Sequence, residues 1–167
     1  MVETDMIFVS KVKYEGIFSF KDFYKFCYDW LTEETDLLVQ EEKYAEKIEG
    51  NAKNIDIEWV GKKKLSDYFQ FVMKVKFKIL YLSKVEINKD GKKISTNKGI
   101  VEISAKGIIA RDYQGKFEVS PAKKVWRGIY EKFVIPSRIK QVEDKIIGDS
   151  DEFLGQAKAY LDIEGKK

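Results

Sequence analysis

Apolar and polar residues alternate with a period of two over much of the middle of the chain. The clearest case is the segment 67–87, DYFQFVMKVKFKILYLSKVEI, where lysines alternate with apolar residues. Such alternation is typical of a strand with one buried and one solvated face. A straight strand of this length is too long for a small sheet, so we expect a bulge or strong coiling near "LYLS" at 80–83. The apolar parity includes Phe71, Met73, Val75, Phe77 and Ile79, and the polar parity includes Lys74, Lys76 and Lys78.

Further strands are predicted on both sides of this segment. Asp90-Gly91 favours a type I′ hairpin turn that pairs 67–87 with the strand after it. Gly107, inside that partner strand, indicates a bend or a bulge. The pattern predicts a curved antiparallel meander of five to seven strands, whose other members are 6–14, 36–48, 54–60 and 100–113.

Helical periodicity occurs near the N-terminus and in the last third of the chain. Ser19, with Asp22 three residues later, is a variant of the capping box and predicts the start of a helix. Ser120-Pro121 predicts a second helix start, and Ile135-Pro136 predicts its end, because a residue before proline avoids the helical region. Ser137 would cap a final long helix with Gly148 as a kink. The apolar stripe of the first helix consists of Phe20, Phe23, Tyr24, Cys27, Trp30 and Leu31.

The order of these elements predicts an α+β fold in a single domain over 1–167, with helices covering one face of an antiparallel sheet. This order resembles the helix-grip arrangement of START-like lipid-transfer and polyketide-cyclase domains, over most of the chain. The resemblance implies a curved sheet that wraps a long C-terminal helix, with an apolar cavity between them. The residues that would line such a cavity, or fill a solid core in its place, are Trp59, Met73, Phe77, Trp126 and Tyr130.

Composition narrows the chemistry. The chain has 167 residues, a net charge of +3 and no histidine. Without histidine there is no Ser-His-Asp or Cys-His pair and no His-ligated metal. The single cysteine, Cys27, excludes an intramolecular disulfide, and its place on the helical stripe indicates a core residue. No phosphate-binding glycine loop or EF-hand spacing occurs. We therefore predict no catalytic residue, no cofactor and no metal.

Location and partners follow from the same composition. The N-terminus has no basic segment followed by an apolar one, and no apolar run reaches about 18 residues, so we expect a cytoplasmic protein without a membrane span. The small net charge and the scarcity of arginine argue against a nucleic-acid partner.

Three hypotheses follow. The preferred one is a non-enzymatic binding or interaction module, which holds an apolar small molecule between sheet and C-terminal helices or self-associates through 137–163. The second is weak RNA or anionic-surface binding through Lys74, Lys76 and Lys78, although alternation alone explains these lysines as a solvated strand face. The third is a cyclase- or hydrolase-like enzyme using Asp, Glu, Tyr or Lys groups, with the first candidates in the "ARDY" stretch at Arg111, Asp112 and Tyr113.

Overall fold

A computed structural model of the chain describes residues 3–66, 68–111, 125 and 135–166. Within this part, a five-stranded antiparallel sheet in the order β1-β5-β4-β3-β2 is combined with one helix after the first strand and one at the C-terminal end. This confirms the predicted α+β class and the antiparallel meander. The elements are β1 (Glu3–Phe18), α1 (Phe20–Glu34), β2 (Leu38–Glu49), β3 (Ala52–Lys64), β4 (Phe69–Lys89), β5 (Lys92–Arg111) and α3 (Ile135–Gly165).

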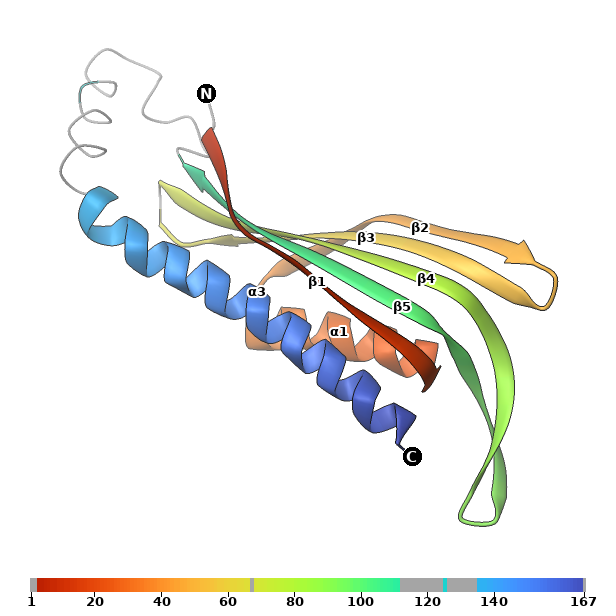
Figure 1. The fold of residues 1–167 in the computed structure, drawn as a ribbon. Helices are drawn as coiled ribbons and strands as arrows, with labels where there is room; N and C mark the ends of the chain where they lie inside the picture. The colour runs from red at the N-terminus through yellow and green to blue at the C-terminus, as the bar shows by residue number, and fades with distance from the viewer. Residues whose placement is uncertain (1–2, 67, 112–124, 126–134, 167) are drawn as a thin grey trace.

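Both helices lie on the same side of the sheet (Figure 1). We call this side the inner face and the opposite side the outer face. Along β4 from Phe69 to Ile79 the inner-face residues are buried, whereas the lysines between them are exposed. The core forms where the inner face meets the apolar sides of the helices, because burial of apolar area is the main driving force of folding. The helices contribute Phe23, Cys27 and Leu31 from α1 and Ile146, Phe153, Ala157 and Leu161 from α3.

The turn and the bulge predicted for β4 are both present. Asp90 and Gly91 have positive φ angles of 53° and 78°, as a type I′ turn requires. The register between β4 and β5 shifts between Leu80 and Ser83, and Tyr81 has a φ of 56°. Beyond this shift the two strands curve away from the body as a hairpin, which we call the hairpin arm and define as residues 83–98 (Figure 1).

Gly107 has a different role from the predicted one. It pairs with Met73 of β4 without a register shift, and the irregularity lies in β1, between Met6 and Phe8. A Cβ at Gly107 would lie 2.7 Å from Cγ2 of Ile146 and 2.8 Å from Oγ of Ser150. The glycine is therefore needed because α3 crosses β5 too closely for a side chain.

The start of α1 agrees with the prediction, whereas the start predicted for the last helix does not. α1 begins at Phe20, and Oγ of the predicted cap Ser19 accepts a hydrogen bond from the backbone N–H of Asp22 at 3.4 Å. Ser137, predicted as the cap of the last helix, lies inside α3, which covers Ile135–Gly165. The predicted end of the preceding helix at Ile135-Pro136 is not tested, because residues 126–134 lie outside the described part of the chain. A proline in the first turn is tolerated, since backbone N–H groups there have no partner within the helix. α3 then continues through Gly148, and the helix predicted from Pro121 falls outside the described residues apart from Val125.

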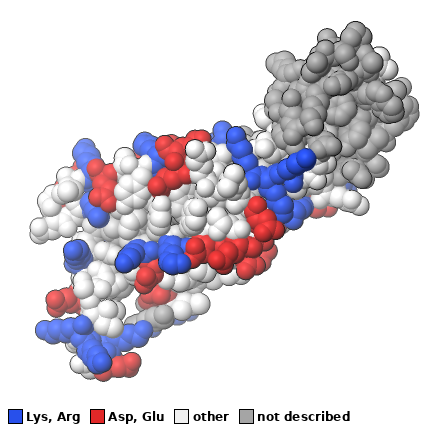
Figure 2. Space-filling view, turned by 180° about the vertical axis from the view of Figure 1, so that it is seen from behind, with Lys and Arg blue, Asp and Glu red and all other residues white. Residues whose placement is uncertain are grey.

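Charge is mixed over the body and concentrated on the hairpin arm. Seen from behind, Lys and Arg are interspersed with Asp and Glu, and basic groups gather at the lower left, where the arm ends (Figure 2). The arm carries Lys84, Lys89, Lys92, Lys93 and Lys98 against Glu86 and Asp90, an excess equal to the net charge of +3 of the whole chain. The rest of the sequence therefore has equal numbers of basic and acidic residues.

Candidate outer-face anion site

The three lysines predicted as an anionic-ligand face all lie on the outer face of β4, but their neighbours differ. Lys78 lies between Glu102 of β5 and Asp56 of β3 in the strand register. The ammonium group of Lys76 lies 3.7 Å from Oε1 of Glu58. Acidic neighbours of this kind are typical of a solvated strand face, and exposed pairs contribute about 0–1 kcal/mol. These two lysines therefore need no ligand to explain them.

Lys74 has a different environment. It lies directly opposite Lys106 of β5, with Val60 of β3 on its other side. Within the described residues, no carboxylate lies within ion-pair distance of Lys74 or Lys106, whereas Lys76 in the next row has Glu58. Like charges directly opposite each other on neighbouring strands destabilise a sheet by roughly 0.2–1 kcal/mol. An anion placed between the two ammonium groups would remove this repulsion.

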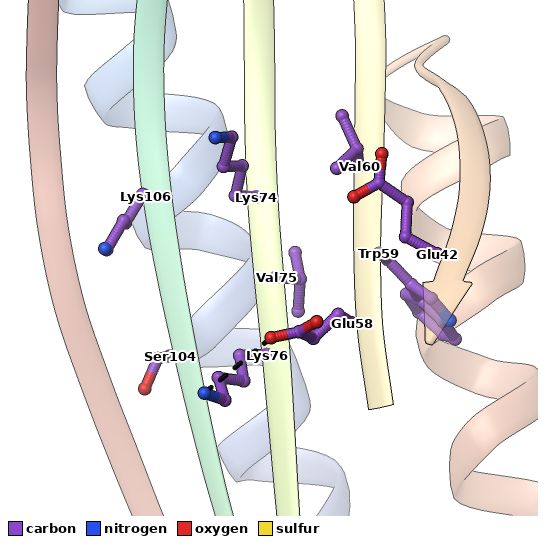
Figure 3. Close-up of a pocket in the computed structure, with 9 residues that line it drawn as sticks. All are labelled: Glu42, Glu58, Trp59, Val60, Lys74, Val75, Lys76, Ser104 and Lys106. Atoms are coloured by element: carbon purple, nitrogen blue, oxygen red, sulfur yellow. Dashed lines mark ion pairs between the residues drawn. The ribbon is translucent and has the colours of Figure 1, made fainter. Parts of the chain in front are cut away.

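A hollow of about 420 Å³ contains this lysine pair (Figure 3). Lys74, Lys76, Lys106 and the hydroxyl of Ser104 come from the central strands β4 and β5. The two carboxylates of the hollow come from the β3 and β2 side, and the helices lie behind the sheet. The full lining is Glu42, Glu58, Trp59, Val60, Lys74, Val75, Lys76, Ser104 and Lys106.

Glu42 restricts what the hollow can bind. The register between β2 and β3 shifts between Glu41 and Lys43, so Glu42 is the extra residue of a bulge at the edge of the hollow. Its carboxylate faces the ligand space from the side opposite the lysine pair (Figure 3). A ligand with several anionic groups would meet this carboxylate, whereas a ligand with one anionic group would not. The arrangement therefore favours a single carboxylate or phosphate on Lys74 and Lys106.

The residues predicted for an apolar cavity occupy the core instead, as far as the structure describes them. Trp59, Met73 and Phe77 have at most 2% of their surface exposed. The ring centroids of Trp59 and Phe77 are 4.8 Å apart, at van der Waals contact. The other two predicted residues, Trp126 and Tyr130, lie outside the described residues. A cavity ligand therefore stays a prediction.

One polar contact at the edge of the core has no counterpart in the predictions. Oε1 of Glu41 accepts hydrogen bonds from the hydroxyl of Tyr24 at 2.7 Å and from Nε1 of Trp59 at 3.2 Å. Burial and the Glu41 carboxylate raise the pKa of Tyr24 to about 12. Alternation could not reveal this contact, because it joins α1, β2 and β3. It attaches the edge strand to the first helix, which is a structural role.

The structure describes two of the remaining candidate groups, Cys27 and Arg111. Cys27 is fully buried, as predicted, and burial raises the pKa of its thiol well above the usual range. Such a thiol is a poor nucleophile. Nη2 of Arg111 lies 2.9 Å from Oδ2 of Asp5, whereas Asp112 and Tyr113 lie outside the described residues. The enzyme hypothesis therefore stays untested.

Self-association through 137–163 would have to use residues other than the apolar stripe of α3. Ile146 and Phe153 have at most 1% of their surface exposed and pack within their own chain. Neither side chain is therefore available for contact with a second copy of the chain. Among the side chains of α3 that the structure describes, the exposed large apolar residues are Ile147 and Ile163, at 39% and 59% exposure.

Comparisons with known proteins add no assignment. No protein-family model, curated protein or solved structure matches the chain. Over the part of the chain that the structure describes, no cluster of three His, Cys, Asp or Glu side chains could hold a metal ion. No helix within the same residues is long and apolar enough to span a membrane.

Proposed function

We propose that this protein is a non-enzymatic binding module that takes up a small molecule with one anionic group in the outer-face hollow. The observation that carries the proposal is the cross-strand pair Lys74 and Lys106, which has no carboxylate within ion-pair distance among the described residues. Charge-assisted hydrogen bonds from two ammonium groups, together with the hydroxyl of Ser104, suit a carboxylate or a phosphate.

Several features favour a small ligand over RNA. The two outer-face rows that contain Lys74 and Lys76 include no aromatic ring on any described strand. Binding of single-stranded RNA usually depends on bases that stack on aromatic side chains. The net charge of +3 is also small for a protein that tracks a phosphate backbone.

The helix-grip resemblance supports a second form of the binding hypothesis, with an apolar ligand between sheet and helices. In that form Trp59 and Phe77 would have to separate, because their rings are in contact. We therefore place the ligand on the outer face in the preferred form. A cytoplasmic location is part of the proposal, since the lone cysteine Cys27 suits a reducing compartment.

Native mass spectrometry of freshly purified protein is the first experiment. A bound ligand would appear as extra mass that denaturation releases. The variants Lys74→Gln and Lys106→Gln should each lose it, whereas Lys78→Gln should retain it, because Lys78 lies between Glu102 and Asp56. Retention of the ligand in both of the first two variants would place it elsewhere.

Inorganic phosphate is the probe if the purified protein carries no ligand. We expect phosphate to raise the melting temperature of the wild-type protein more than chloride does at equal ionic strength, because binding to the folded state stabilises it. The difference should vanish in Lys74→Gln and persist in Lys78→Gln. An equal response of all three proteins to the two salts would reject the site.

A further inference from the structure

A second, larger hollow lies on the inner side of the sheet, at the end where the hairpins project. Its volume is about 560 Å³, within the range of roughly 300–1,000 Å³ typical of small-molecule sites. It is bounded by the first residues of α1, the turn between β2 and β3, and the bend of β4 at the base of the hairpin arm. Figure 1 shows the β2–β3 hairpin and the bend of β4 and β5 extending past the start of α1 at this end of the molecule. We call this hollow the hairpin groove.

The walls of the hairpin groove include three large apolar side chains from three separate elements. They are Phe20 of α1, Ile48 of β2 and Leu82 of β4. Leu82 has 2% of its surface exposed, whereas Ile48 has 75% exposed. An aliphatic side chain as exposed as Ile48 gains free energy when a hydrocarbon covers it, by about 25 cal/mol per Å² of buried area. The groove therefore suits a ligand with an apolar body.

The charged groups of the hairpin groove are all basic. Lys21, Lys53 and Lys84 line it, and none of its described lining residues is Asp or Glu. Lys53 is partly neutralised, because its ammonium group lies 3.4 Å from Oε1 of Glu46. Lys21 and Lys84 have no carboxylate within ion-pair distance in the part of the chain that the structure describes. The outer-face hollow, in contrast, includes two carboxylates in its lining.

Two side-chain amides hold the frame of the hairpin groove in place. Oδ1 of Asn97 accepts a hydrogen bond from the backbone N–H of Phe20 at 3.1 Å, which joins the start of α1 to β5. Oδ1 of Asn54 accepts one from the backbone N–H of Tyr81 at 2.9 Å, which joins β3 to the bend of β4. The walls are thus positioned before any ligand arrives. Such preorganisation lowers the entropic cost of binding.

We propose that the hairpin groove binds an amphipathic carboxylate, a hydrocarbon chain that ends in one carboxylate group. The hydrocarbon would cover Ile48 and the accessible part of Phe20, and the carboxylate would accept hydrogen bonds from Lys21 and Lys84. The combination of an apolar wall with two unpaired cations selects this class over neutral lipids and over small inorganic anions. The proposal does not depend on the outer-face site, which involves other residues on the opposite face of the sheet.

Dodecanoate is the probe, and dodecanol is its neutral counterpart. We expect isothermal titration calorimetry at low ionic strength and neutral pH to show dodecanoate binding at least about tenfold more tightly than dodecanol, since a charge-assisted hydrogen bond contributes about this factor or more. The double variant Lys21→Gln/Lys84→Gln should lose this preference by weakening dodecanoate alone. Ile48→Ser should weaken both compounds, and because Ile48 is exposed this variant should fold normally.

Matched controls locate the site. Lys89→Gln/Lys92→Gln makes the same change of charge at the end of the hairpin arm, outside the groove, and should leave dodecanoate affinity within about twofold of the wild-type value. Lys74→Gln/Lys106→Gln should also leave it unchanged. The proposal is overturned if dodecanoate does not bind, if dodecanol binds equally well, or if the groove variants and the control variants weaken dodecanoate to the same extent.

Discussion

The two faces of β4 are built from alternate residues of one strand, yet they have opposite roles. On the inner face, Phe77 is 2% exposed and contacts the rings of Phe23 and Trp59. One residue earlier, Lys76 lies on the outer face with its side chain 58% exposed. The inner face at Phe77 is filled by side chains of α1 and β3, whereas the outer face around Lys74 carries a hollow.

This difference separates stability from binding. Substitutions on the inner face change the packing of the whole domain, because close-packed cores respond to the loss of even one methylene group. Substitutions of exposed lysines usually change stability by less than about 0.5 kcal/mol. The outer face can therefore carry a binding site whose residues are replaced without loss of the fold. Three predictions test this separation.

The largest effect is expected for Phe77→Ala. Removal of a buried phenyl ring that contacts Phe23 and Trp59 should lower the free energy of unfolding by about 3–5 kcal/mol. Lys78→Ala, at the next residue of the same strand, should change it by less than about 0.5 kcal/mol. Urea denaturation of both variants measures the contrast. Similar losses in the two variants would show that the outer face is not independent of the core.

An intermediate effect is expected for Tyr24→Phe, at the edge of the inner face. Loss of the hydrogen bond from the Tyr24 hydroxyl to Glu41 should lower the free energy of unfolding by about 1 kcal/mol at neutral pH. The pKa of Tyr24 is raised to about 12 in the folded protein, from the ordinary value of 10.0. The folded state therefore holds this proton more tightly, and the stabilisation is complete below the unfolded pKa and is lost as pH rises through the folded one.

The difference in stability between the wild-type protein and Tyr24→Phe should accordingly be constant up to the unfolded pKa and then shrink toward pH 12. Denaturation of both proteins across the alkaline range measures it, and comparison of the two cancels the titration of the lysines they share. Tyr81→Phe, at a ring that is 61% exposed, is the control and should change stability little. A difference that grows with pH would contradict the assignment of the raised pKa to Tyr24.

The pairing of Lys74 with Lys106 shows how far the sequence could predict the site. If β4 and β5 paired residue for residue from the Asp90-Gly91 turn, Lys74 would lie opposite Gly107. The strands follow this register from the turn only as far as the pair of Ser83 and Lys98. The shift between Leu80 and Ser83 moves the register by one residue and brings Lys106 opposite Lys74. The sequence predicted a bulge near this point. It did not predict the size of the shift, which decides the face of every residue beyond it.

Tertiary packing accounts for the other differences between expectation and structure. Period-two and helical patterns found the strands, the first helix and the buried stripes, because each pattern reflects local geometry. The close approach of α3 to Gly107, and the hairpin groove that Lys21 and Lys84 both line, involve elements that are far apart in the chain. Contacts between distant segments leave no periodic pattern in the sequence from which they could be predicted. Residues for a cavity or groove were consequently harder to predict than residues for the core.

The smallest effect, and the most specific to the outer face, is expected from a pair of lysine substitutions that should act in opposite directions. Lys74→Gln relieves its repulsion with Lys106 and should raise the free energy of unfolding by up to about 0.5 kcal/mol in ligand-free protein at low salt. Lys76→Gln removes the ion pair with Glu58 and should lower it by a similar amount. Both changes should shrink as salt screens the charges, which urea denaturation at low and high ionic strength can follow. A loss of stability in Lys74→Gln would mean that Lys74 has an attractive partner, and the reason to place an anion beside it would disappear.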